Sequence, residues 1–172
     1  DVTPAQVLKL AEKYFGGIAP GPPVAHFEQW VAKRTGEQRQ IAQDRVPQAR
    51  IYKVWNIPGV GSADNDYLNL LSDILYSDKA SRLYKRLIYD DQTATSGGAS
   101  LDQREIASLF VIQMTAKPGG DINKVEAGVD QELARLLAEG PTQDELDRVK
   151  TQYFSQFVRG AERIGGFGGK SD

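Results

Sequence analysis

The segment of residues 106–115 constrains the fold most, because it is apolar at successive positions and not only at alternating ones. Its larger apolar side chains are Leu109, Phe110, Val111, Ile112 and Met114. A strand that is apolar on both faces is typical of the interior of a sheet. The segment therefore predicts a central strand, and the rest of the chain must supply its neighbours and the helices that pack against it.

Other segments predict further strands, because they carry β-branched and aromatic residues and end at Gly or Pro. We expect strands at residues 29–33, 38–43 and 49–57, and a strand with small polar side chains at residues 93–101. With the central strand, they predict a mixed or antiparallel sheet of about five to six strands.

Amphipathic helices are predicted between and after these strands. Apolar residues at helical spacing follow Ala63, Ser81, Asp121 and Thr142. Thr142-Gln-Asp-Glu145 is a capping box, in which the first and last side chains bond each other's backbone N–H groups. The order of strands, two helices, two strands and two long helices predicts an α+β fold.

The N-terminal residues differ from this pattern. Thr3 and Pro4 start a helix within residues 1–18, and the Pro/Gly-rich residues 19–25 form an extended connector that fits neither a helix nor a sheet interior. Residues 26–172 then form one α+β domain, since 172 residues with 40% hydrophobic content suffice for one core. We interpret the sequence as a fragment of a longer protein.

The composition argues against two classes of partner, nucleic acid and membrane. The 21 basic and 23 acidic residues are scattered and give a net charge of −2, so no basic patch for nucleic acid is expected. No apolar run approaches the roughly 18 residues that a membrane span requires. The absence of cysteine fits cytoplasm and periplasm alike.

Two stretches resemble one known family. Ser81-Arg-Leu-Tyr-Lys-Arg-Leu-Ile88 followed by Ala94-Thr-Ser96, and Pro141-Thr-Gln-Asp-Glu-Leu-Asp-Arg-Val-Lys150, are similar to the second domain of a half of the M16 (pitrilysin/insulinase-type) zinc metallopeptidases. The order of the predicted elements agrees with this resemblance over nearly the whole chain. It implies the metallopeptidase-M16-like (LuxS/MPP-like) fold and a bacterial origin, in periplasm or cytoplasm.

The catalytic motifs of that family are missing. The chain has one histidine, His26, no cysteine and no His-x-x-Glu-His motif, whereas zinc needs three or four convergent ligands. Alignment with the half that completes the active site puts Ile88 and Thr95 where an Arg and a Tyr are needed. We therefore expect no catalytic residue, metal or cofactor in this segment, and zinc elsewhere in the parent protein.

The resemblance implies a wall of a peptide-binding chamber. Its partners are then peptide or unfolded protein, the domain with the His-x-x-Glu-His motif, and the second M16 half in the same chain or in a partner subunit. An alternative is an inactive homologue with a role in assembly or scaffolding, as in the core subunits of respiratory bc1 complexes.

The candidate substrate-binding residues form one strand. Small side chains and two glycines let a second backbone approach closely, which strand addition requires. A β-bulge in an ordinary edge strand is the alternative, since interior glycines often mark bulges. The six residues are Ala94, Thr95, Ser96, Gly97, Gly98 and Ala99.

Gly165-Gly-Phe-Gly-Gly-Lys-Ser171 invites comparison with a phosphate-binding loop. It lacks the first glycine of that motif, whose place is taken by Ile164, and it follows a helix rather than a strand. A glycine break at the end of a helix is the favoured interpretation.

Overall fold

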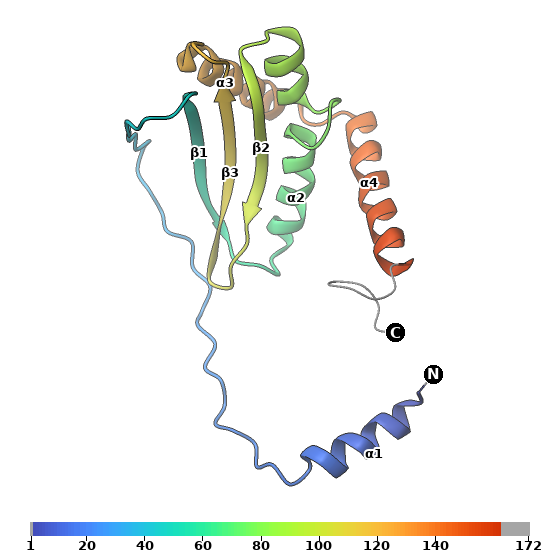
Figure 1. Cartoon of the computed structure of the whole chain (residues 1–172). Helices are drawn as coiled ribbons and strands as arrows, with labels where there is room; N and C mark the ends of the chain where they lie inside the picture. The colour runs from blue at the N-terminus through green and yellow to red at the C-terminus, as the bar shows by residue number, and fades with distance from the viewer. Residues whose placement is uncertain (1, 163–172) are drawn as a thin grey trace.

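The computed structural model describes residues 2–162, and the glycine-rich segment at 165–171 lies outside these residues. The chain divides into an N-terminal arm (residues 2–48) and a body (residues 49–162) of sheet and helices (Figure 1). In chain order the elements are α1 (Pro4–Phe15), β1 (Arg50–Pro58), α2 (Ala63–Leu75), the π-helix η1 (Tyr84–Asp90), β2 (Ala94–Asp102), β3 (Ala107–Ala116), α3 (Ile122–Glu139) and α4 (Gln143–Glu162).

The sheet is antiparallel and has the strand order β1-β3-β2, which confirms that the apolar segment is the central strand. The prediction of five to six strands is wrong for the described residues, which form three. Residues 29–33 and 38–43 form neither helix nor strand and pair with no described strand. A strand needs a neighbouring backbone as well as a suitable composition, and within residues 2–162 nothing pairs with these segments.

Helices cover one face of the sheet. Figure 1 shows α2 beside β2, with α4 beyond α2, and α3 and η1 near the end of the sheet where β1 begins. Every second side chain of β3 from Ser108 to Met114 points into this layer and is buried. The core that these elements enclose includes Leu75, Leu83, Leu87, Phe110, Ile112, Met114, Val125 and Val129.

The opposite face is open in the described part of the molecule. Leu109 and Val111 of β3 are only half-buried there, and Tyr52 and Val54 of β1 are 56% and 51% exposed. We call this surface the open face and the other the covered face. The apolar side chains on both faces of β3 correctly predicted a central strand. In the described residues, however, helices pack on only one of its two faces.

The helix predicted after Ser81 is present as a π-helix, in which the Asp91 N–H donates to the Arg86 carbonyl five residues earlier. Its Leu87 is fully buried and lies against Gly128 of α3, where an added Cβ would overlap the leucine side chain. A glycine at this position lets α3 approach η1 closely.

The capping box of α4 is confirmed, and its glutamate has a second role. Glu145 accepts from the Thr142 N–H at 2.8 Å, and its own N–H donates to the Thr142 hydroxyl at 3.2 Å. The same carboxylate accepts from buried Arg82 Nε and Nη2 at 2.6 and 2.7 Å, and Arg82 Nη2 also donates to the Gly140 carbonyl. One ion pair thus joins the segment before η1 to the turn between α3 and α4.

The arm makes a different kind of contact with the body. No side chain of residues 2–48 is buried. Arg39 pairs with Glu126 of α3, and the Asn56 amide donates to the Ala32 carbonyl at 3.0 Å. These polar contacts fix the extended chain beside the body, while α1 lies apart from it (Figure 1).

Candidate functional site

The candidate residues lie on β2, which among residues 2–162 pairs with β3 alone. Along an antiparallel strand, successive backbone N–H and C=O groups point alternately toward and away from the neighbouring strand. The backbone N–H of Lys117 points toward the β2 side of β3, because it donates to the Thr93 carbonyl. The direction reverses at each residue, so the backbone groups of Gln113, four residues earlier, also point toward β2. Gly98 lies opposite Gln113 and therefore faces β3.

Gly97 and Ala99 consequently present their backbone groups at the outer edge of β2. The Gly97 N–H confirms this direction, because it donates to the Tyr76 hydroxyl at 2.9 Å and not to β3. The outer edge is the part of the sheet where a further extended chain could pair.

The two glycines differ in which face of the sheet they border. A Cβ at Gly97 would overlap the sulfur of Met114 on the covered face. A Cβ at Gly98 would meet only the Gln113 side chain, at 3.6 Å, on the open face. Gly97 is therefore required by packing, whereas Gly98 has room for a side chain.

A β-bulge is present in this strand, and it lies at Thr95 rather than at the glycines. The register shifts between Ala94, opposite Ala116, and Ser96, opposite Thr115. The Thr95 hydroxyl accepts from the Gln48 amide at 3.0 Å, and that amide also donates to the Ala116 carbonyl. Gln48 thus holds the bulge from the end of the arm. Beyond it, residues 96–102 pair with β3 in an uninterrupted register.

Tyr76 is the residue at this site that the sequence did not indicate. It is the C-cap of α2, and its ring packs on Tyr84 at a centroid distance of 6.0 Å. Burial raises the pKa of the Tyr76 phenol, against the lowering effect of the bond from Gly97. The contact joins residues 21 positions apart, and no local motif encodes it.

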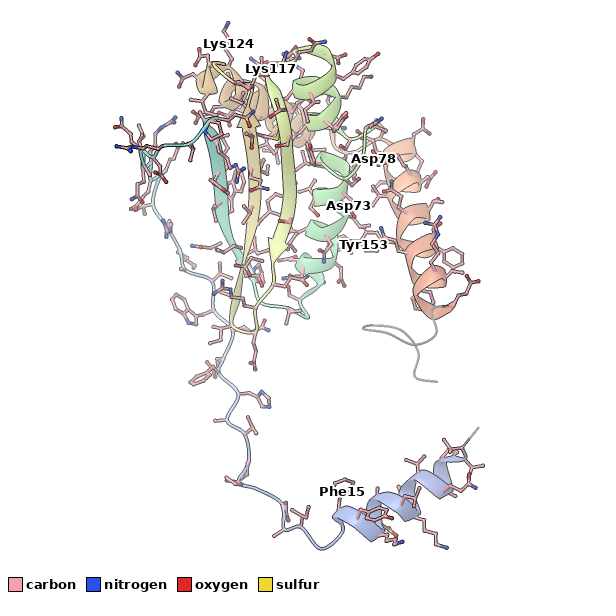
Figure 2. The ribbon with its side chains drawn as sticks, in the orientation of Figure 1. Phe15, Asp73, Asp78, Lys117, Lys124 and Tyr153 are labelled. Carbon is pink, nitrogen blue, oxygen red and sulfur yellow. The ribbon has the colours of Figure 1, made fainter. Side chains whose placement is uncertain are left out.

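The carboxylates between α2 and α4 bind neighbouring side chains (Figure 2). Burial raises the pKa of Asp73, beside the Tyr153 hydroxyl. Asp78 accepts from Arg148 at 2.8 Å and from the Gln152 amide at 2.6 Å. Both aspartates therefore connect α4 to the body, and their geometry is explained by this structural role.

The remaining candidates make local contacts. His26 pairs with Glu105 at 3.1 Å, and both side chains are exposed. Within residues 2–162 no three His, Cys, Asp or Glu side chains gather in a way that could hold a metal ion. Ile88 packs against the core, and Thr95 is exposed. None of the helices in this range is long and apolar enough to cross a bilayer.

Comparison with known families identifies the type of domain. The sequence model described as the peptidase M16 inactive domain matches residues 1–153. The chain belongs to the M16 peptidase family. Within it, the match is to the domain described as inactive. A search of the curated proteins found no match.

Several solved structures share this fold. A protease from Helicobacter pylori has a TM-score of 0.73 and 20% identity over 93% of this chain and 40% of its own. The peptidase M16 inactive domain from Pseudomonas fluorescens has a TM-score of 0.67 and 18% identity, over 89% of this chain and 37% of its own. The "Inactive Peptidase Domain of a Putative Zinc Protease" from Bordetella parapertussis has a TM-score of 0.57 and 21% identity, over 69% and 65%. This M16 chain thus spans less than two thirds of each.

Proposed function

We propose that this chain is a non-catalytic part of the peptide-binding chamber of an M16 zinc metallopeptidase, and that the outer edge of β2 binds extended peptide by main-chain pairing. The observation that supports it is the edge itself. Gly97 and Ala99 direct backbone groups away from β3, and the small side chains of β2 leave room for another chain. Backbone pairing binds peptides with little dependence on their side chains, as a peptidase for unfolded protein requires.

The zinc site would lie outside this chain, in a domain with the His-x-x-Glu-His motif. The neighbouring structures support this division, because they include an inactive peptidase domain whose name assigns it to a zinc protease. The second M16 half, in the same chain or in a partner subunit, would close the chamber. The parent protein would be a bacterial zinc metalloendopeptidase, and this domain would contribute binding rather than chemistry.

Proline substitution on the two sheet edges tests the site. Ala99→Pro removes an outward N–H from β2 and places a ring at the edge. The matched control is Val54→Pro on β1, where alternation from the Ala116 N–H bond to the Ala49 carbonyl makes the Val54 N–H point outward too. Both variants keep the ladder bonds to β3.

Binding of a fluorescently labelled, unstructured peptide to the chain is then measured by anisotropy, with circular dichroism as the check on folding. We expect Ala99→Pro to weaken binding at least about 10-fold and Val54→Pro to leave it nearly unchanged, since only one edge pairs with peptide. Weakening by Val54→Pro alone would assign the peptide to β1. A folded chain that binds no peptide would favour the assembly or scaffolding role.

A further inference from the structure

The outer edge of β2 is already partly occupied in the free chain. The phenol of Tyr76 reaches across from the end of α2 and accepts the Gly97 N–H at 2.9 Å. A peptide that pairs with this edge would bring a backbone carbonyl to the same N–H, because that N–H points away from β3. One N–H at the edge cannot make a full hydrogen bond to both oxygens.

We propose that Tyr76 is a placeholder for substrate, whose hydroxyl is displaced when a peptide carbonyl takes over the Gly97 N–H. This inference rests on the proposed function of the β2 edge. It adds a residue that modulates peptide affinity and that lies outside the strand itself.

The surroundings of Tyr76 allow such a movement. The side chain is half-buried, and its ring contacts Tyr84 in a tilted arrangement. Tyr84 in turn lines an open hollow of about 320 Å³ together with Lys79, Lys85 and Tyr89. The ring of Tyr76 therefore contacts a residue that lines a hollow open to solvent, and a half-buried phenol that leaves Gly97 can form hydrogen bonds to solvent water.

The placeholder also explains how an unoccupied edge is protected. Exposed N–H and C=O groups at a sheet edge are a template for unwanted pairing with other chains. A phenol blocks this contact reversibly, because a neutral hydrogen bond has a small net strength and a pairing strand replaces it with an equivalent one. Glycine at position 97 is required by Met114 on the covered face, so no side chain of its own can shield the position.

The decisive variant is Tyr76→Phe, which keeps the ring against Tyr84 and removes only the hydroxyl. We expect the labelled peptide to bind about 2- to 10-fold more tightly, the gain when one neutral hydrogen bond need not be broken first. Tyr84→Phe is the control, since it removes a neighbouring phenol hydroxyl that makes no hydrogen bond to β2 within the described residues. Unchanged or weaker binding by folded Tyr76→Phe would overturn the proposal.

Hydrogen exchange at the Gly97 amide gives a second measurement. The amide should be protected in the unsubstituted chain, exchange at least about 10-fold faster in free Tyr76→Phe, and regain protection when peptide is added. Should Tyr76→Phe fail to fold, NMR signals of the Tyr76 ring in the unsubstituted chain decide, because peptide must shift them more than those of Tyr89. Rings that do not respond to saturating peptide would overturn the placeholder.

The proposed function fails separately from this inference. Peptide binding that Ala99→Pro leaves intact, or no binding by the unsubstituted chain, would refute the β2 site and the placeholder together. Binding that Ala99→Pro abolishes but Tyr76→Phe does not strengthen would refute the placeholder alone.

Discussion

The covered and open faces of the sheet are built on the same three strands but differ in how tightly they are filled. On the covered face a single added Cβ overlaps its neighbours at Gly97 and Gly128. On the open face Gly98 has space, and Tyr52 and Val54 remain exposed. Adjacent residues of one strand therefore differ in packing, because Gly97 borders the filled core and Gly98 borders the less filled open face.

Truncation of Leu87 is expected to have the largest effect. The Leu87 side chain of η1 is fully buried and lies against Gly128 of α3. Leu87→Ala should therefore lower the free energy of unfolding by about 3 kcal/mol, through lost burial and a residual cavity. Val111→Ala, on the half-buried open side of β3, is the comparison and should cost about 1 kcal/mol. Urea unfolding measures both, and equal losses would contradict the difference between the faces.

Acid should lower the free energy of unfolding by protonating Glu145. The bond from Arg82 and those from Thr142 lower the pKa of this carboxyl from 4.5 to about 2, against the opposing effect of burial. A carboxyl with a lowered folded-state pKa stabilises the fold above pH 4.5, and this stabilisation is lost as the pH falls toward 2, in total on the order of 3 kcal/mol. Urea unfolding at several pH values between these limits measures the loss.

Glu145→Gln provides the control for the acid effect. The variant should be less stable than the unsubstituted chain at pH 7 and should approach its stability at low pH, because its amide cannot titrate. A parallel pH dependence of the two proteins would show that other groups cause the acid sensitivity.

The smallest effect concerns the two glycines, which compare the faces most directly. Gly97→Ala should lower the free energy of unfolding by about 2 kcal/mol, because the methyl group overpacks against Met114. Gly98→Ala should be neutral or stabilise by about 0.5 kcal/mol, since the space is open and alanine restricts the unfolded chain. Thermal unfolding separates these outcomes, and a reversed order would show that the faces were wrongly assigned.

The sequence predicted the elements whose signals are local. The apolar run of β3, the capping box at Thr142 and the helix after Asp121 each depend on a few neighbouring residues, and the structure confirms them. Residues 29–33 and 38–43 were wrongly predicted as paired strands, because composition describes a strand but not its partner. The sequence predicted a helix after Ser81 but not its π-helical geometry.

The candidate site was predictable only in part. The small residues of β2 identified a strand that a second backbone could approach, and the structure places Gly97 and Ala99 with outward backbone groups. Which glycine faces the core could not be read from the sequence, because side-chain direction depends on register, and the bulge at Thr95 changes that register. Tyr76 could not be predicted, because its contact depends on where α2 ends in space.

The attachment of the arm to the body should depend on ionic strength, because one of its contacts is an ion pair. Arg39 is exposed and Glu126 is half-buried in their ion pair, and no side chain of residues 2–48 is buried to reinforce it. At 1 M salt the Debye length falls to about 3 Å, so the attraction of such a partly exposed pair is weakened while the buried core is little affected. Salt should therefore release the chain around Arg39 from α3 without unfolding the body. The arm of this 172-residue chain would then detach at a salt concentration at which the body stays folded.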